Sequence, residues 1–263
     1  MASLTRFPIK RVKKASERIY VSKKELMKKK LSYFDLLYIR HMCAYKFAVP
    51  YIKNEIVLDL GCGSGYGTYY LSTKDLKQII GIDISKEAIE YSKREYFNDN
   101  LQYEIMDSSK LAFKKNSFDV VICFQVIEHI DNLDHFLSDI HRTTKMFIVS
   151  TPNKKTFNDA GRNPFHVREF YLNDLQVLLQ SVFQKVNMFG VYPVIQTQNI
   201  CNKVEKLQAQ IDNLHLRPFL DLIPIRIKKL LSFIFFKIDE DISFKIHGNP
   251  SENCLDFIAV CIK

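Results

Sequence analysis

The stretch EIVLDLGCGSGYG, from Glu55 to Gly67, constrains the fold of this chain more than any other feature. Its apolar half, 56–60, predicts a short buried strand, and its second half has a glycine at every other position. A helix-like segment follows at 68–72. Strand, glycine turn and helix in this order predict the start of a nucleotide-binding α/β sheet. Glycines there let a ligand lie against bare backbone, and the helix N–H groups face its negative end.

The spacing of the glycines separates two kinds of nucleotide ligand. A dinucleotide fingerprint, G-x-G-x-x-G, needs a third glycine where this chain has Tyr66 or Thr68, which argues against a dehydrogenase. An acid, Asp59, stands two residues before the loop. The loop itself has glycines at alternate positions: Gly61, Gly63 and Gly65.

Two further predicted strands are also followed by acids. The apolar run 78–82 leads into Asp83, and the alternating run 101–105 leads to Asp107. An acid at the end of a second strand, about 20 residues past the loop, can accept both hydroxyls of a ribose. The remaining strands are predicted at 118–124, 147–153, 182–190 and 254–262.

These motifs resemble those of class I S-adenosylmethionine (SAM) dependent methyltransferases, especially members found in glycan and small-molecule biosynthesis. SFDVVICFQVIEHI at 117–130 and FIVSTPN at 147–153 are similar to the same family, and the resemblance covers residues 45–190. It implies a Rossmann-like α/β fold with a seven-stranded, mostly parallel sheet, an antiparallel last strand and flanking helices. It also implies SAM as the cofactor, bound by Asp59, Gly61, Gly63, Gly65, Asp83, Ile84, Asp107, Ser108 and Gln125.

Two histidines are the candidate catalytic residues. His129 follows the fourth strand, and His166 lies in NPFHVREF at 163–170, which resembles an N-P-x-H-x-R-E element of the same methyltransferases. A histidine with a pKa near neutral pH can take the proton of an oxygen or amine acceptor. The alternatives are a structural hydrogen bond to the loop backbone for His129 and a cofactor-lid role for the His166 loop.

Arg168 is the candidate substrate-binding residue, because a guanidinium can pair with a carboxylate or phosphate through two hydrogen bonds. An internal ion pair with Glu169 or Asp174 is the alternative. Some quinone-pathway O-methyltransferases that resemble this chain around Glu128–His129 use a metal there, but they have a further acid where Gln125 stands. The sequence therefore predicts no metal site.

The net charge of +9 comes from the N-terminal end of the chain. Residues 1–30 contain 11 Lys or Arg and two acids, whereas the rest of the chain contains 27 of each sign. Such a basic arm can bind an anionic partner, such as nucleic acid, anionic lipid or a phosphate-bearing substrate. A solvated tail is the alternative, and so is a mitochondrial presequence, because residues 1–16 contain no acid.

Four parts of the chain are predicted. They are a basic arm at 1–30, a helical lead-in at 31–50, a SAM-binding domain at 51–197 and 250–263, and a helical insert at 198–249. Within the insert, 222–236 is apolar with three basic residues. This segment could lie on an anionic membrane surface, or pack on its own domain or a dimer partner.

The sequence predicts a cytoplasmic enzyme. No apolar run is long enough for a membrane-spanning helix, no secretory leader is visible, and the six cysteines form no C-x-x-C pair. The expected reaction is methyl transfer from SAM to a small-molecule or glycan-type acceptor at oxygen, where the choice of oxygen rests on the resemblance alone. The alternatives are an RNA or protein methyltransferase that docks through the basic arm and a non-catalytic SAM-binding protein. The oligomeric state is left open.

Overall fold

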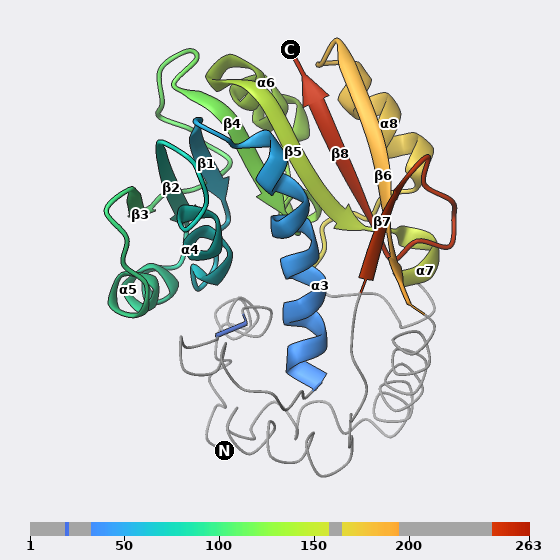
Figure 1. The fold of residues 1–263 in the computed structure, drawn as a ribbon. Coiled ribbons are helices and arrows are strands. Elements are labelled where there is room, and N and C mark those ends of the chain that lie inside the picture. The colour runs from blue at the N-terminus through green and yellow to red at the C-terminus, as the bar shows by residue number, and fades with distance from the viewer. Residues whose placement is uncertain (1–18, 21–32, 158–164, 195–243) are drawn as a thin grey trace, which may run out of the picture.

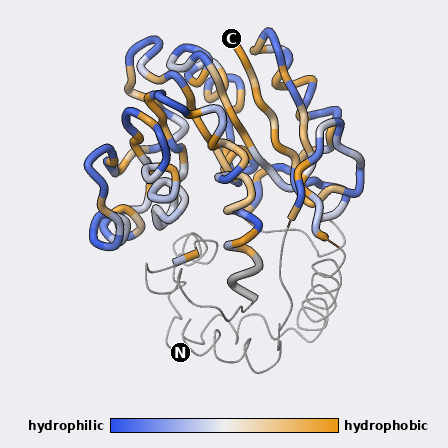
Figure 2. The backbone as a smooth tube through the Cα atoms, viewed as in Figure 1, coloured by the Kyte–Doolittle hydropathy of each residue, from blue (hydrophilic) through white to orange (hydrophobic). Residues whose placement is uncertain are grey.

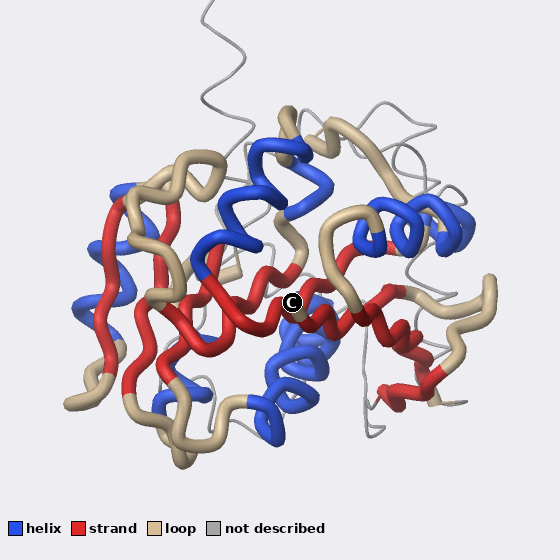
Figure 3. The backbone as a smooth tube through the Cα atoms, turned by 90° about the horizontal axis from the view of Figure 1, so that it is seen from above, coloured by secondary structure: helices blue, strands red, loops and turns tan. Residues whose placement is uncertain are grey.

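The computed structural model describes residues 19–20, 33–157, 165–194 and 244–263. These residues form one mixed β-sheet with helices on both of its faces (Figures 1 and 3). The described strands are β1 (Ile56–Leu60), β2 (Gln78–Asp83), β3 (Leu101–Ile105), β4 (Phe118–Phe124), β5 (Thr144–Pro152), β6 (Lys185–Pro193), β7 (Phe244–Gly248) and β8 (Asp256–Ile262). The described α-helices are α3 (Tyr33–Ala48), α4 (Tyr66–Ser72), α5 (Lys86–Glu95), α6 (Leu133–Thr143), α7 (Lys154–Phe157) and α8 (Leu172–Gln180), and the 3-10 turns are η1 (Val49–Tyr51) and η2 (Ile127–His129).

The order of the strands confirms the predicted Rossmann-like α/β fold. Across the sheet it is β3-β2-β1-β4-β5-β8-β6-β7, and β1 to β5 run parallel to one another. The strand order reverses between β1 and β4, and ligands of such sheets bind outside the carboxyl ends of the strands at that point. The last strand, β8, runs antiparallel to both β5 and β6, as predicted.

The sheet has eight strands among the described residues, not the predicted seven. The additional strand is β7, which pairs antiparallel with β6 and lies in the segment predicted as a helical insert. Phe244 and Ile246 alternate with polar residues and pack against the core, which is the pattern of a strand with one buried face. The rest of the insert, including 222–236, and the basic arm apart from 19–20 lie outside the described residues.

The boundaries of three predicted strands were also wrong, and the fifth strand runs over 144–152 rather than 147–153. The sixth strand begins at Lys185 rather than near 182, because Ser181 and Phe183 still donate backbone hydrogen bonds to the last turn of α8. The last strand begins at Asp256, since the N–H of Cys254 turns back to the carbonyl of Ser251. Strand β6 is therefore shifted by three residues at both ends, whereas β8 is shorter by two residues, and both keep their predicted place in the sheet.

The core lies on both faces of the sheet, as expected for parallel strands covered by helices. Neighbouring residues of β1 belong to opposite clusters: Leu58 packs on the side of α6 and α8, and Val57 on the side of α3, α4 and α5. Figure 2 shows the hydrophobic residues concentrated along the strands. Because the apolar residues of the strands pack in the core, the polar residues at the strand ends are the ones available to bind a ligand.

The lead-in is helical, as predicted, and α3 gives way to η1 at Pro50. Helix α3 packs against α4, β4 and β7, and it continues past the carboxyl ends of the parallel strands (Figure 1). Its polar side chains thereby reach the edge of the sheet where a ligand is expected. Within the described part of the chain, no helix is both long and apolar enough to cross a membrane.

Candidate active site

The glycine loop joins β1 to α4 and turns through left-handed backbone. Gly61, Gly63 and Gly65 have φ angles of 69°, 56° and 81°. A methyl group at Gly61 would overlap Val126, whereas one at Gly63 would meet no atom within 4 Å. Gly63 therefore exposes bare backbone to open space, which suits close approach of a ligand.

The carboxylate of Asp83, at the end of β2, is held against this loop. Its Oδ2 accepts the N–H of Gly63 at 3.1 Å, and its Oδ1 accepts the N–H of Ser85 at 2.7 Å. The residue is only 5% exposed, so the carboxylate has a fixed orientation. Each carboxylate oxygen has two lone pairs, so the group can still accept hydrogen bonds from a ribose. The structure thus fits the role predicted for Asp83.

Asp59 lies deeper than Asp83, and its described partners are protein hydroxyls. It is fully buried and accepts hydrogen bonds from Thr68 at 2.6 Å and from Tyr45 at 3.2 Å. Burial raises the pKa of Asp59 to about 7, although both hydrogen bonds act in the opposite direction. Asp59 therefore holds α4 and α3 in place around the glycine loop, and its predicted contact with the cofactor stays a prediction.

A cavity of about 750 Å³ opens beside the ends of β2 and β3. Ile84, Asp107 and His129 line it, and Ile84 is 46% exposed. An exposed apolar side chain next to an acid suits the face and amino edge of an adenine ring. Ser109, which was not among the predicted site residues, donates to Oδ1 of Asp107 through its N–H and its hydroxyl, whereas the predicted contact of Ser108 with the cofactor stays a prediction. The Asp-x-Ser spacing of an Asx turn was the available signal.

Gln125 follows β4 with a strained backbone. Its φ is 57°, a conformation that non-glycine residues seldom adopt and that often occurs at functional sites. Its side-chain amide donates to Ser150 and to Asp256, each at 3.3 Å. Asp256 in turn accepts two hydrogen bonds from Arg40 of α3, at 2.6 and 2.5 Å. Sequence reasoning missed Arg40 and Asp256, which are far apart in the chain.

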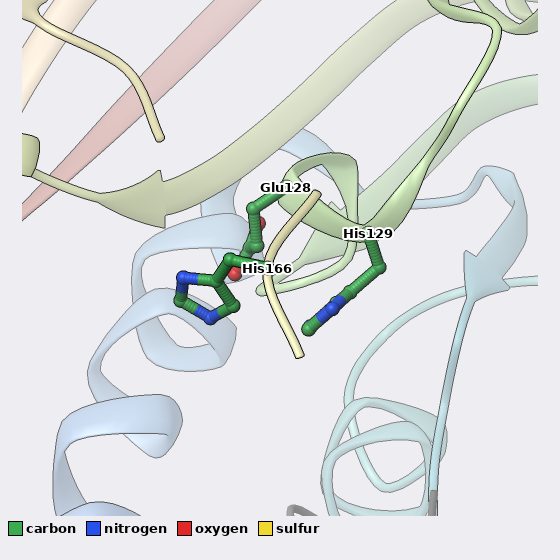
Figure 4. A group of neighbouring side chains, drawn as sticks. All are labelled: Glu128, His129 and His166. Atoms are coloured by element: carbon green, nitrogen blue, oxygen red, sulfur yellow. The ribbon is translucent and has the colours of Figure 1, made fainter. Parts of the chain in front are cut away.

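The two candidate catalytic histidines lie next to each other. The rings of His129 and His166 are 5.1 Å apart in an edge-to-face arrangement, beside the carboxylate of Glu128 (Figure 4). Nδ1 of His129 lies 3.0 Å from the carbonyl oxygen of Phe165. A carbonyl can only accept, so Nδ1 of His129 carries a proton. This hydrogen bond is the structural role foreseen for His129, and it also orients the ring.

His166 is the more deeply placed of the two histidines, with a side chain that is 6% exposed. Burial, with a smaller contribution from His129, lowers the pKa of His166 to about 4. His166 is therefore neutral near pH 7. A neutral imidazole has a lone pair with which to accept a proton, but a pKa of about 4 lies below the near-neutral value expected of the general base, so His166 is a weaker base than predicted.

Glu128, His129 and His166 together have donor atoms of the kinds that bind transition metals. One ligand atom from each lies within 4.8 Å of the others. Glu128 is buried, and its Oε2 already accepts the hydroxyl hydrogen of Thr151 at 3.0 Å. Sequence analysis, which expected no metal site, did not foresee this group, because His166 stands 37 residues after His129.

Arg168 is held by protein carbonyl groups. Its guanidinium donates to the carbonyl of Asp131 at 2.7 Å, and its backbone N–H donates to the carbonyl of Glu128 at 3.3 Å. No ion pair joins Arg168 to Glu169 or Asp174, which are both within the described residues. The internal ion pair weighed as an alternative is therefore absent there, and the role of Arg168 in substrate binding stays a prediction.

The fold and the site define a class of protein. It is a Rossmann-like domain in which the glycine loop and Asp83, the acid expected to bind a ribose, suit SAM. Residues 58–146 match the family described as "Methyltransferase domain". A Mycobacterium tuberculosis protein named "Probable S-adenosylmethionine-dependent methyltransferase" is 32% identical over 162 residues, which cover 58% of this chain and 57% of the relative. Residues 58–146 are thus similar to a methyltransferase domain, in agreement with the class I SAM-dependent methyltransferase motifs of the sequence, and SAM is the cofactor named for the mycobacterial relative.

Two other proteins extend the comparison. A ubiquinone biosynthesis O-methyltransferase from Pelagibacter ubique is 29% identical over 107 residues, covering 39% of this chain and 44% of the relative. The crystal structure of a SAM-dependent methyltransferase from Thermotoga maritima is 13% identical and has a TM-score of 0.58, over 88% of this chain and 93% of that chain. The structural likeness supports the fold. The chain spans little more than half the length of the mycobacterial relative and less of the ubiquinone enzyme.

Proposed function

We propose that the protein transfers a methyl group from SAM to an oxygen of a small-molecule or glycan-type acceptor. The observation that carries this proposal is the position of His129, which lines the same cavity as Ile84 and Asp107. His166 lies beside His129, so a candidate base stands next to the expected cofactor site. The choice of oxygen draws support from the ubiquinone biosynthesis O-methyltransferase among the relatives.

Each part of the site has a distinct task in this proposal. Asp83 and Gly63 would hold the cofactor, which supplies an activated methyl group when it is bound. Ile84 and Asp107 would contact the adenine. His166 would take the proton of the acceptor, and Arg168 would bind an anionic group of it. The protein's main contribution is then positioning, because the donor already carries the reactive methyl group.

A methyl-transfer assay with mass spectrometry tests the proposal. The purified chain is incubated with SAM and panels of phenolic, sugar and small hydroxylated acceptors, and products that gain one methyl group are sought. Replacing His166 with Ala is expected to lower turnover far more than SAM affinity. If the substitution instead weakens SAM binding with turnover at saturation unchanged, the His166 loop is a cofactor lid and His166 is not the base.

The basic arm favours a second candidate, methylation of RNA or protein. Its 11 Lys or Arg residues within 1–30 could dock a nucleic acid. The test is a binding shift with RNA that weakens steeply with salt and is lost when residues 1–30 are deleted. A non-catalytic SAM-binding protein, the third alternative, would bind SAM and methylate nothing in any of these panels.

A further inference from the structure

The carboxylate of Glu169 lies beside the imidazole of His166. Oε1 of Glu169 is 3.5 Å from Nδ1 of His166, and the two side chains are 10% and 6% exposed. Among the residues that the structure describes, no hydrogen-bond donor reaches this Oε1 atom. A buried carboxylate oxygen without a donor is unfavourable, and such atoms often mark a functional role.

The neighbouring cation does not account for the position of Glu169. Arg168 points its guanidinium at the carbonyl of Asp131, as described above, and makes no ion pair with Glu169. The guanidinium of Arg168, the cation nearest to Glu169 in the sequence, thus binds the Asp131 carbonyl and not the Glu169 carboxylate. The ring of His166 is then the described polar neighbour of the Glu169 carboxylate.

The backbone around this pair is fixed on both sides. The N–H groups of Val167 and Arg168 donate to the carbonyl of Glu128 at 3.0 and 3.3 Å. Further along, the carbonyl of Phe170 accepts the N–H of Lys154 at 2.9 Å. Because the segment is tied to η2 and to the end of β5, the relative position of the Glu169 and His166 side chains is set by the fold.

We propose that Glu169 is a positioning residue that accepts the Nδ1 proton of His166 and so presents the Nε2 lone pair to the acceptor. The proposal rests on the proposed function, and it adds a carboxylate–imidazole pair to the site. His129 is oriented in the same way, by the hydrogen bond from its Nδ1 to Phe165. The rings of His129 and His166 would then both carry a proton on Nδ1.

The transfer step balances with Glu169 in this role. The acceptor oxygen forms a bond to the methyl carbon while the carbon–sulfur bond breaks, and that electron pair stays on the sulfur, which becomes neutral. The hydroxyl proton moves to Nε2 of His166, and the resulting imidazolium donates from Nδ1 to the Glu169 carboxylate. A separation of 3.5 Å is long for a hydrogen bond, and such bonds often shorten only when the substrate is bound.

The first test needs no activity. Nitrogen-15 NMR of the imidazole in the full-length protein is expected to show a neutral His166 with the proton on Nδ1 at pH 7. Glu169→Gln offers an amide donor to Nδ1 and is expected to move the proton to Nε2. A wild-type His166 that already carries its proton on Nε2 would overturn the proposal, whether or not the protein transfers methyl groups.

The second test is kinetic and includes a matched control. Glu169→Gln is expected to lower kcat by about a hundredfold or more, with the KM for SAM nearly unchanged. The acidic limb of the kcat profile should move to lower pH, because the carboxylate that stabilises the imidazolium is gone. Asp174→Asn removes the same charge from an exposed position of α8 and should change neither quantity.

A double variant distinguishes a positioning role of Glu169 from a structural one, because the losses of kcat should not be additive if Glu169 acts through His166. The double variant His166→Gln/Glu169→Gln should be no slower than His166→Gln alone, because Glu169 acts through His166. Additive losses, or a lower kcat with an unmoved acidic limb in a folded variant, would contradict the proposal. If the wild type methylates no acceptor, the proposed function fails, while the NMR result still decides the role of Glu169.

Discussion

The backbone N–H of Gly63 donates to the Asp83 carboxylate at 3.1 Å, and this bond joins the glycine loop to the end of β2. The loop and the acid are separate signals in the sequence, and the fold makes them one site. Asp83 also accepts the N–H of Ser85, the N-cap residue of α5. A ligand bound here would therefore contact a carboxylate and a peptide plane that are already fixed relative to each other.

Gly63 of the glycine loop and Gly67 of α4 are expected to respond differently to a methyl group. Gly63→Ala should destabilise the fold by only about 1 kcal/mol, from the left-handed backbone, and should weaken SAM binding because the methyl group fills open space. Gly67→Ala should destabilise by about 1–3 kcal/mol, because its methyl group would overlap the Tyr45 ring. Chemical denaturation and calorimetry of both variants measure these effects. Equal loss of stability in both would contradict the assignment of Gly63 to the ligand.

The buried carboxylate of Asp59 predicts a pH-dependent stability. Its pKa is raised to about 7 in the folded protein, above its unfolded value, so the folded state binds a proton more tightly. Its contribution to the free energy of unfolding is full in acid and falls as pH rises toward 7, by a few kcal/mol as an order of magnitude. Asp59→Asn should lack this decline, so its unfolding free energy relative to wild type should rise between pH 4 and 7. A constant difference across that range would refute the raised pKa.

The Arg40–Asp256 ion pair is expected to stabilise the protein. Asp256 is 3% exposed and accepts from Arg40 and Gln125, so Arg40→Gln would leave a buried carboxylate without its cation. A loss of about 3–5 kcal/mol is expected in urea denaturation. The control is Lys53→Gln, which removes a cation from an exposed pair with Asp75 and should cost less than about 1 kcal/mol. Similar losses in the two variants would argue against this role.

Removal of metals is expected to leave activity unchanged. The Glu128–His129–His166 group has only three ligand atoms, and Glu128 already accepts the Thr151 hydroxyl. Dialysis against a strong chelator, followed by the methyl-transfer assay in metal-free buffer, measures the effect. An activity that disappears and returns on addition of a divalent ion would assign the cluster to a metal instead of to base catalysis.

The cofactor half of the site was readable from the sequence because its residues lie at strand ends. A buried strand, a glycine turn and a second strand ending in Asp83 have fixed places in a parallel sheet, so their relative positions followed from the order alone. The cavity beside Ile84 and Asp107 agrees with that inference. Local patterns sufficed because each element contacts its neighbour in sequence.

The remaining contacts around the site are ones that no local pattern encodes. His166 meets His129 through a loop that follows β5, and Arg40 meets Asp256 across 216 positions of the chain. Strand β7 was missed because five alternating residues at the end of a long predicted insert are a weak signal. These contacts arise from the way the two halves of the sheet and α3 pack together.

The most direct test of the account is calorimetric titration of SAM into the wild-type protein and its Asp83→Asn variant, with NAD as the control ligand. We expect SAM to bind the wild type and NAD not to bind it, and we expect Asp83→Asn to weaken SAM binding by about tenfold to a hundredfold, as for the loss of a charged hydrogen bond. A folded variant with unchanged SAM affinity, or a wild type that binds NAD and not SAM, would contradict it.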